Sequence, residues 1–266
     1  MQDLHRYVAV AEEFPNDPSE KIKSGGLMHD RRVARIITPG TLIDENFMDP
    51  YANNYVMAIY LPEAAAGAVS PAPEKHNVPP AVGSSRAVTP LGLAWLDLST
   101  GYFFTQTTSL SSLPSVLSRV SPRELVLAQD LQSSPDAEIF SILSEDRHLI
   151  TYTPPSTLRG HDDWLPMLES GIPADAVGTF TDDEIKAGSL LLDYVKDRLR
   201  GLSMKLQPPV RHENMQVMSI DRNSMRSLEI KQTIKDAAFR GSLLHAIRRT
   251  VTKSGARLLN EWLSTT

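Results

Sequence analysis

A β-hairpin followed by alternating helices and strands is the sequence feature that most limits the folds open to this chain. Residues 91–107 contain two runs rich in apolar and aromatic residues, GLAWLDL and YFFTQT, which a Ser-Thr-Gly turn joins. Four segments with helical and strand-like patterns then alternate: 110–120, 124–128, 135–145 and 148–152. This order predicts a mixed β-sheet flanked by helices, which is an α/β fold.

Three shorter strand candidates precede the hairpin, at residues 6–14, 32–38 and 54–60. The segment 62–90 separates the last of them from the hairpin. It holds six prolines on an Ala/Gly/Ser background and very few large apolar residues. Because such a composition offers little burial to offset the entropy of ordering, it predicts a disordered insert.

The last third of the chain has a helical pattern. The clearest helix spans residues 182–200, where Thr181 and Glu184 are spaced as a capping box. Shorter helical patterns follow at 221–231, 242–249 and 254–263. We therefore expect residues 181–266 to be all-α and separate from the sheet.

Charge is distributed unevenly, although the net charge is only −5. Residues 1–180 carry 12 Lys/Arg against 22 Asp/Glu, whereas residues 181–266 carry 15 against 10. Two basic clusters are candidates for contacts to a DNA backbone: Lys21, Lys23, Arg31, Arg32 and Arg35 in the first, and Arg248, Arg249, Lys253 and Arg257 in the second. A solvated charged surface remains the alternative, since no aromatic residues are interleaved for base stacking.

One set of carboxylates could be catalytic. Asp97 lies in the first strand of the hairpin, where ribonuclease H-type nucleases place a magnesium-binding aspartate, and Glu124 and Asp130 could join it. Alternatively, Asp97 organises the turn that follows it. The chain has no cysteine and no Gly-Lys pair, which excludes thiolate chemistry and a phosphate-binding P-loop within it. No apolar run approaches the roughly 20 residues of a membrane span.

Taken in order, these segments resemble the MutS family of DNA mismatch-repair proteins. VAVAEEF at 8–14 and RRVARIITPGTLIDE at 31–45 are similar to the end of the family's mismatch-binding domain. NNYVMAIY at 53–60 and LGLAWLDLSTGYFF at 91–104 are similar to the start of its connector domain. MSIDRNSMRSLEI followed by GSLLHAIRRTVTKSGARLLNEWL, within 218–263, is similar to the start of its lever, or core, domain and is the most specific of the three.

The resemblance implies three parts: a remnant of the mismatch-binding domain at 1–45, a ribonuclease H-like connector at 46–160, and the start of a helical lever at 161–266. It implies an α/β plus all-α fold and a scaffold role in a mismatch-recognition protein. The family's ATPase P-loop would lie beyond residue 266, so we expect no enzymatic activity and no cofactor in this chain, with ATP and Mg²⁺ belonging to the full-length family. A magnesium nuclease using Asp97 and a stand-alone interaction module are the alternatives.

The resemblance also implies partners and a location. The expected partners are double-stranded DNA, bound weakly or not at all by this segment alone, a MutS-type dimer partner and downstream repair factors, but no membrane. SGGLMHDRRVARIITPGTLIDE at 24–45 is similar to organellar members from fungi and plants, which implies a mitochondrial protein and otherwise a nuclear one. The Phe-x-Glu triplet with which family members recognise a mismatch is absent, so we expect a fragment or a truncated product.

Overall fold

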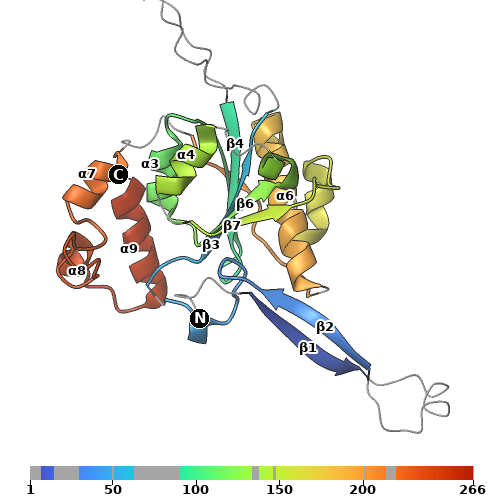
Figure 1. Ribbon diagram of the computed structural model, residues 1–266, viewed down its shortest axis with the longest axis horizontal. Helices are drawn as coiled ribbons and strands as arrows, with labels where there is room; N and C mark the ends of the chain where they lie inside the picture. Colours follow the sequence, from blue (N-terminus) through green and yellow to red (C-terminus); the bar gives the residue numbers. More distant parts are fainter. Residues whose placement is uncertain are drawn as a thin grey trace, which may run out of the picture.

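The computed structural model describes residues 7–14, 30–49, 51–62, 90–133, 138–145, 148–200, 202–213 and 220–265. These residues form an α/β domain, a two-stranded hairpin that projects from it, and a helical segment on one side (Figure 1). Residues 63–89, the bulk of the predicted insert, lie outside the described residues.

A six-stranded mixed sheet forms the centre of the α/β domain. Its order is β7-β6-β3-β4-β5-β8. The strands are β3 (Tyr55–Tyr60), β4 (Pro90–Asp97), β5 (Tyr102–Ser109), β6 (Glu124–Ala128), β7 (Ile150–Thr153) and β8 (Val210–Arg211). Strands β3, β4 and β5 are antiparallel neighbours, whereas β6, β7 and β8 each join the sheet in parallel. The predicted mixed sheet is therefore confirmed, in an arrangement consistent with a ribonuclease H-like connector.

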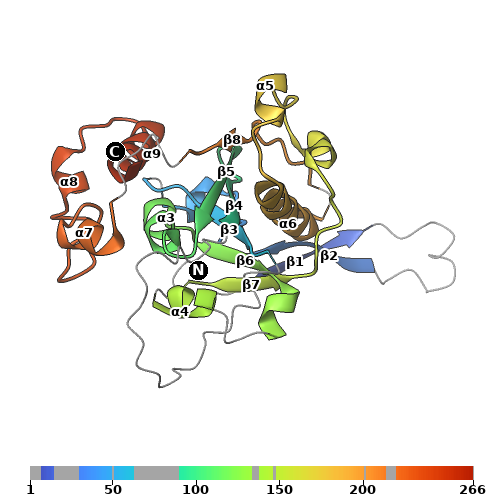
Figure 2. The same cartoon turned by 90° about the horizontal axis from the view of Figure 1, so that it is seen from above.

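Helices cover both faces of this sheet. One face carries α3 (Leu113–Val120) and α4 (Glu138–Glu145), and the other carries α6 (Asp182–Leu199) (Figure 2). Because side chains alternate along a strand, Val56 of β3 packs toward α6, while the next residue, Met57, packs toward α3. Short helical turns connect these elements: Glu45–Phe47, Gln129–Ser133, His161–Met167 and Ala174–Val177.

Helix α6 begins at the predicted capping box. The Glu184 amide donates to the Thr181 hydroxyl, and the Glu184 carboxylate accepts from the Thr181 amide. The expectation that residues 181–266 form a separate helical unit is nevertheless wrong for its first part. Helix α6 packs its apolar side onto the sheet, and β8 at Val210–Arg211 pairs with β5. An amphipathic pattern predicts a buried helix face without showing what covers it, and two residues are too few for a strand pattern.

The hairpin consists of β1 (Val8–Phe14) and β2 (Asp30–Ile37), which pair antiparallel; the sequence predicted the two strands but not their pairing. The helical segment, residues 220–265, holds α7 (Arg222–Ser227), α8 (Leu243–Ile247) and α9 (Lys253–Thr265) and lies beside α3. The α/β domain thus extends to Arg211 rather than ending at 160. The assignment of connector and lever to these parts stays a prediction. In the described ranges, no helix has the length and apolar character needed to cross a membrane.

Candidate functional site

Asp97, the sequence candidate for metal binding, is fully buried and organises the turn after β4. One carboxylate oxygen accepts from the amide (2.8 Å) and the hydroxyl (2.7 Å) of Ser99, and the other accepts from the Asn54 amide (3.0 Å). Both oxygens of the Asp97 carboxylate therefore accept hydrogen bonds from neighbouring residues of the chain. This confirms the alternative in which Asp97 stabilises the turn.

Glu124 lies on the opposite face of the sheet from Asp97. Asp97 is paired with Tyr55 and Glu124 with Val56, and consecutive residues of β3 point to opposite faces. Asp130 is exposed in the turn Gln129–Ser133. Two carboxylates on opposite faces cannot share a metal ion, and the described residues contain no cluster of three potential ligands. The nuclease hypothesis is therefore unsupported.

Instead, Glu124 joins the hairpin to the α/β domain. One carboxylate oxygen accepts from the Thr38 hydroxyl (2.5 Å) and the Gly40 amide (3.0 Å), both just beyond β2. The other accepts from the hydroxyls of Thr151 in β7 (2.7 Å) and Tyr194 in α6 (2.5 Å). Burial, together with the Glu124 charge, raises the pKa of the Tyr194 hydroxyl. The Glu124 carboxylate thus accepts from four donors in three segments of the chain, and this network fixes the hairpin to the α/β domain.

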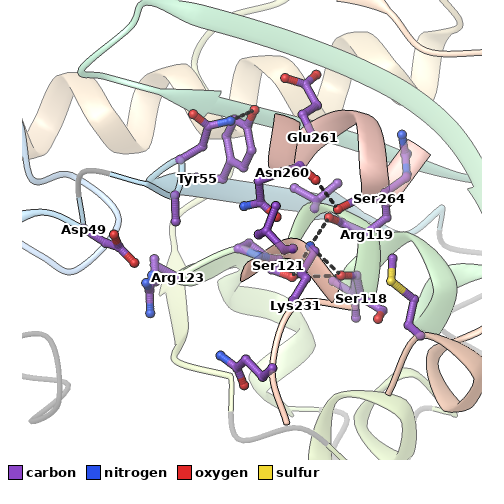
Figure 3. A pocket seen from close by; sticks show the side chains of 18 of the residues that line it. Asp49, Tyr55, Ser118, Arg119, Ser121, Arg123, Lys231, Asn260, Glu261 and Ser264 are labelled. Atoms are coloured by element: carbon purple, nitrogen blue, oxygen red, sulfur yellow. Dashed lines mark hydrogen bonds between the residues drawn. The ribbon is translucent and has the colours of Figure 1, made fainter. Parts of the chain in front are cut away.

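A cleft of about 870 Å³ separates the α/β domain from the helical segment. Its walls are the end of α3, Trp95 of β4 and residues from the segment 49–55 on one side, and α7 to α9 on the other (Figure 3). The charged residues that line it are mainly basic: Arg119, Arg123, Arg226 and Lys231 against Asp49 and Glu261. It is the principal candidate site, because it lies where two structural units meet.

Lys231 crosses this cleft to the end of α3. Its ammonium group donates to the carbonyl oxygens of Ser118 (3.5 Å) and Arg119 (3.1 Å) and to the Ser121 hydroxyl (3.3 Å) (Figure 3). A cation at a helix C-terminus is stabilised by the helix dipole. Burial, and next the nearby Arg119, still lowers the pKa of Lys231 to about 8.

An aromatic wall lines the cleft beside Arg119. The Arg119 guanidinium lies 5.7 Å from the Trp95 ring centroid, and its Nη2 donates to Gln106. The His212 ring lies 5.4 Å from that of Trp95 and 5.2 Å from that of Phe104. Glu261 partly balances the charge of Arg119: burial raises the pKa of Glu261, and the Arg119 charge opposes that rise.

We predict a pH dependence from His212. Burial, and next the Arg119 charge, lowers the pKa of His212 from 6.5 to about 4. Between these values the unfolded chain binds more protons than the folded one, so stability should fall as the pH drops from 6.5 toward 4. NMR titration of the imidazole should give a midpoint near 4, and His212→Gln should flatten the pH dependence of Tm in this window. An imidazole that titrates near 6.5 in the folded protein would contradict the buried position.

The described members of the predicted DNA-backbone set lie on two different parts of the fold, β2 and the region of α8 and α9. The described members of the first cluster lie on β2, where Arg31 forms an ion pair with Glu13 (2.5 Å) and Arg32 is exposed. Lys21 and Lys23 lie outside the described residues. In the second, Arg249 donates to the carbonyls of Ala246 and Arg248.

The rest of the second cluster includes one residue at the surface and one that is packed against aromatic rings. Lys253 is exposed at the start of α9. The Arg248 guanidinium lies 4.1 Å from the Tyr51 ring centroid and 4.7 Å from that of Phe239. DNA contacts by these residues stay a prediction. Lys231, Arg119 and His212 were missed by sequence reasoning, because segments far apart in the chain build the cleft and no local pattern marks it.

Comparison with known proteins gives two family matches. Residues 78–163 match the model described as MutS domain II, and residues 223–265 match MutS domain III. Proteins named DNA mismatch repair protein MutS are similar along nearly the whole chain: 31% identical over 268 residues in Wolbachia pipientis, 30% over 260 in Anaplasma phagocytophilum and 29% over 269 in Nitrobacter winogradskyi. These alignments cover 97–98% of this chain, which spans 28% of the length of these relatives.

Proposed function

We infer that the chain is a segment of a MutS-family DNA mismatch-repair protein that includes domain II and the beginning of domain III. We propose that it serves as the connector and lever scaffold of that protein. The observation that carries the proposal is the agreement of order: the domain II match covers most of the sheet, and the domain III match covers α7 to α9. The same relatives align across both, which favours a scaffold over a stand-alone interaction module.

The two joints of the α/β domain suit this role. The hairpin is fixed to the sheet through the buried Glu124. The helical segment instead meets the sheet across an open cleft. A domain that is fixed to one neighbour and separated from the other by a cleft can hold the first in place while the second changes orientation.

We further propose that this segment holds no catalytic site and no cofactor, and that ATP and Mg²⁺ act in another domain of the full-length protein. Its proposed partners are duplex DNA, a second MutS-type subunit and downstream repair factors. From the similarity of residues 24–45 to organellar members, we propose a mitochondrial location, with the nucleus as the alternative. Imaging of the tagged full-length protein tests the location.

The isolated chain should neither hydrolyse ATP nor prefer a mispair. It contains no P-loop to hold the phosphates and no Phe-x-Glu triplet to enter the duplex at a mispair. The measurement is a gel-shift titration with a matched and a G·T duplex, together with an ATPase assay. A preference for the mispair above about tenfold, worth ~1.4 kcal/mol, would show that recognition resides in this segment.

The scaffold role is tested by exchange. The aligned segment of the Wolbachia pipientis MutS is replaced by residues 1–266, and the purified chimera is assayed for binding to G·T and matched duplexes. We expect it to retain the preference of its parent for the mispair. A folded chimera that binds both duplexes equally would contradict the proposed role.

A further inference from the structure

Three cations of the helical segment contact the α/β domain, and one of them, Lys231, does so across the cleft. Lys231 donates to the end of α3, the Arg248 guanidinium lies over the Tyr51 ring, and Nη1 of Arg257 donates to the Ser99 hydroxyl at 3.4 Å. The partners of all three are carbonyls, hydroxyls or an aromatic ring. In each of these contacts a full positive charge therefore meets a neutral group.

These cations are incompletely compensated in the docked arrangement. Nη1 of Arg248 and Nε of Arg257 are buried without a hydrogen-bond partner among the described residues. A buried donor without a partner is unfavourable. The lowered pKa of Lys231 has the same origin, since the ammonium is buried near Arg119. Three carboxylates in this part of the structure interact with other groups: Asp97 accepts from Ser99, Asp49 accepts from the Tyr51 amide, and the Glu261 charge acts on Arg119 and Tyr55.

Phosphate oxygens would compensate these cations better than the α/β domain does. Hydrogen bonds between a cation and an anionic oxygen are about twice as strong as those between neutral groups, and a polyanion also releases counterions when it binds. The helical segment is basic as a whole, with nine Lys/Arg against four Asp/Glu in residues 220–265. While the segment is docked, a polyanion reaches only the outer cations. It therefore binds the undocked segment more tightly, and such a difference shifts the equilibrium toward undocking.

We propose that a linear phosphate polyanion, such as the backbone of duplex DNA, competes with the α/β domain for Lys231, Arg248 and Arg257 and thereby releases the helical segment. When the polyanion binds, the helical segment then moves away from the α/β domain and the cleft widens. This inference does not depend on a role in repair, because it concerns only the three cations and a phosphate chain.

The test measures the distance between the two units by energy transfer. The chain has no cysteine, so Lys196→Cys in α6 and Ser254→Cys in α9, both exposed positions, provide the only labelling sites. Transfer is recorded during titration with a short duplex, with inorganic polyphosphate, and with orthophosphate at equal ionic strength. Fluorescence anisotropy of a labelled duplex reports binding in parallel.

We expect both polyanions to lower the transfer efficiency and orthophosphate to leave it unchanged. If three phosphates are neutralised, tripling the salt concentration should weaken the release by duplex DNA about 20-fold. Release by the duplex alone would support the proposal and add a requirement for duplex geometry. Binding without any change in transfer would overturn it, and so would the absence of binding.

Variants assign the effect to the three cations. Lys231→Met should lower the number of neutralised phosphates, obtained from the salt dependence of release, by about one. Lys235→Met removes the same charge from an exposed position in the same segment and is the matched control. We expect this variant to release the helical segment as the parent does, because the proposed competition involves only Lys231, Arg248 and Arg257. Circular dichroism confirms that each variant is folded. An equal effect of both substitutions, or no effect of Arg248→Leu and Arg257→Leu together, would overturn the assignment.

Discussion

Gly92→Ala should lower the free energy of unfolding by about 3 kcal/mol or more, because the new methyl group would collide with backbone rather than with a movable side chain. A Cβ atom at this position would lie 1.9 Å from the carbonyl oxygen of Asp183 and 2.9 Å from the amide nitrogen of Glu184. The start of α6 cannot easily move away. The buried Glu184 carboxylate is held by the Thr181 amide and by the Nε of Arg211.

Urea denaturation followed by circular dichroism measures this effect. Gly178→Ala is the control, since a Cβ at Gly178 would meet nothing within 4 Å and its φ of −77° suits alanine. We expect the control to change the stability by no more than about 0.5 kcal/mol. Equal stability of the two variants would show that α6 does not lie this close to β4.

Glu124→Leu should cost about 3–5 kcal/mol, because it leaves several buried neutral donors without an acceptor, at about 1–3 kcal/mol each. Two of its four donors, the Thr38 hydroxyl and the Gly40 amide, hold the chain just beyond the hairpin. Glu124→Gln should cost less. The hydroxyls of Thr151 and Tyr194 can turn to accept from the new amide group, whereas the Gly40 amide can only donate.

The same unfolding experiment distinguishes these variants. Glu138→Gln, at an exposed position at the start of α4, is the control for loss of a negative charge. Hydrogen exchange of the β1–β2 amides adds a local readout, which should lose protection in Glu124→Leu. If that variant unfolded like the parent with the hairpin still protected, Glu124 would not be the joint between the two parts.

Local patterns predicted the elements well. The capping box of Thr181 and Glu184 marked the start of α6, and the turn at 99–101 marked the hairpin of β4 and β5. The packing of α6 on the sheet was not predictable in this way. It depends on the missing side chain at Gly92, and a glycine in a strand gives no indication of which element approaches it.

The candidate site was less predictable than the fold. Asp97 stood out because its position in a hairpin is typical of metal-binding nucleases, but the sheet register directs Glu124 to the other face. Lys231 did not stand out, because its partners at 118–121 lie more than a hundred residues away in the chain. Contacts of this kind follow from tertiary packing, which periodicity and spacing do not encode.

The mutation rate of bacteria that lack their own MutS most directly tests whether this segment works as a mismatch-repair scaffold. The cells carry the Wolbachia pipientis MutS, the chimera with residues 1–266, or the chimera with Glu124→Leu. We expect the chimera to lower the mutation rate to the level given by the parent, and the Glu124→Leu chimera to fail to do so. A chimera that is expressed and folded but leaves the mutation rate at the level of the MutS-deficient cells would contradict the scaffold role.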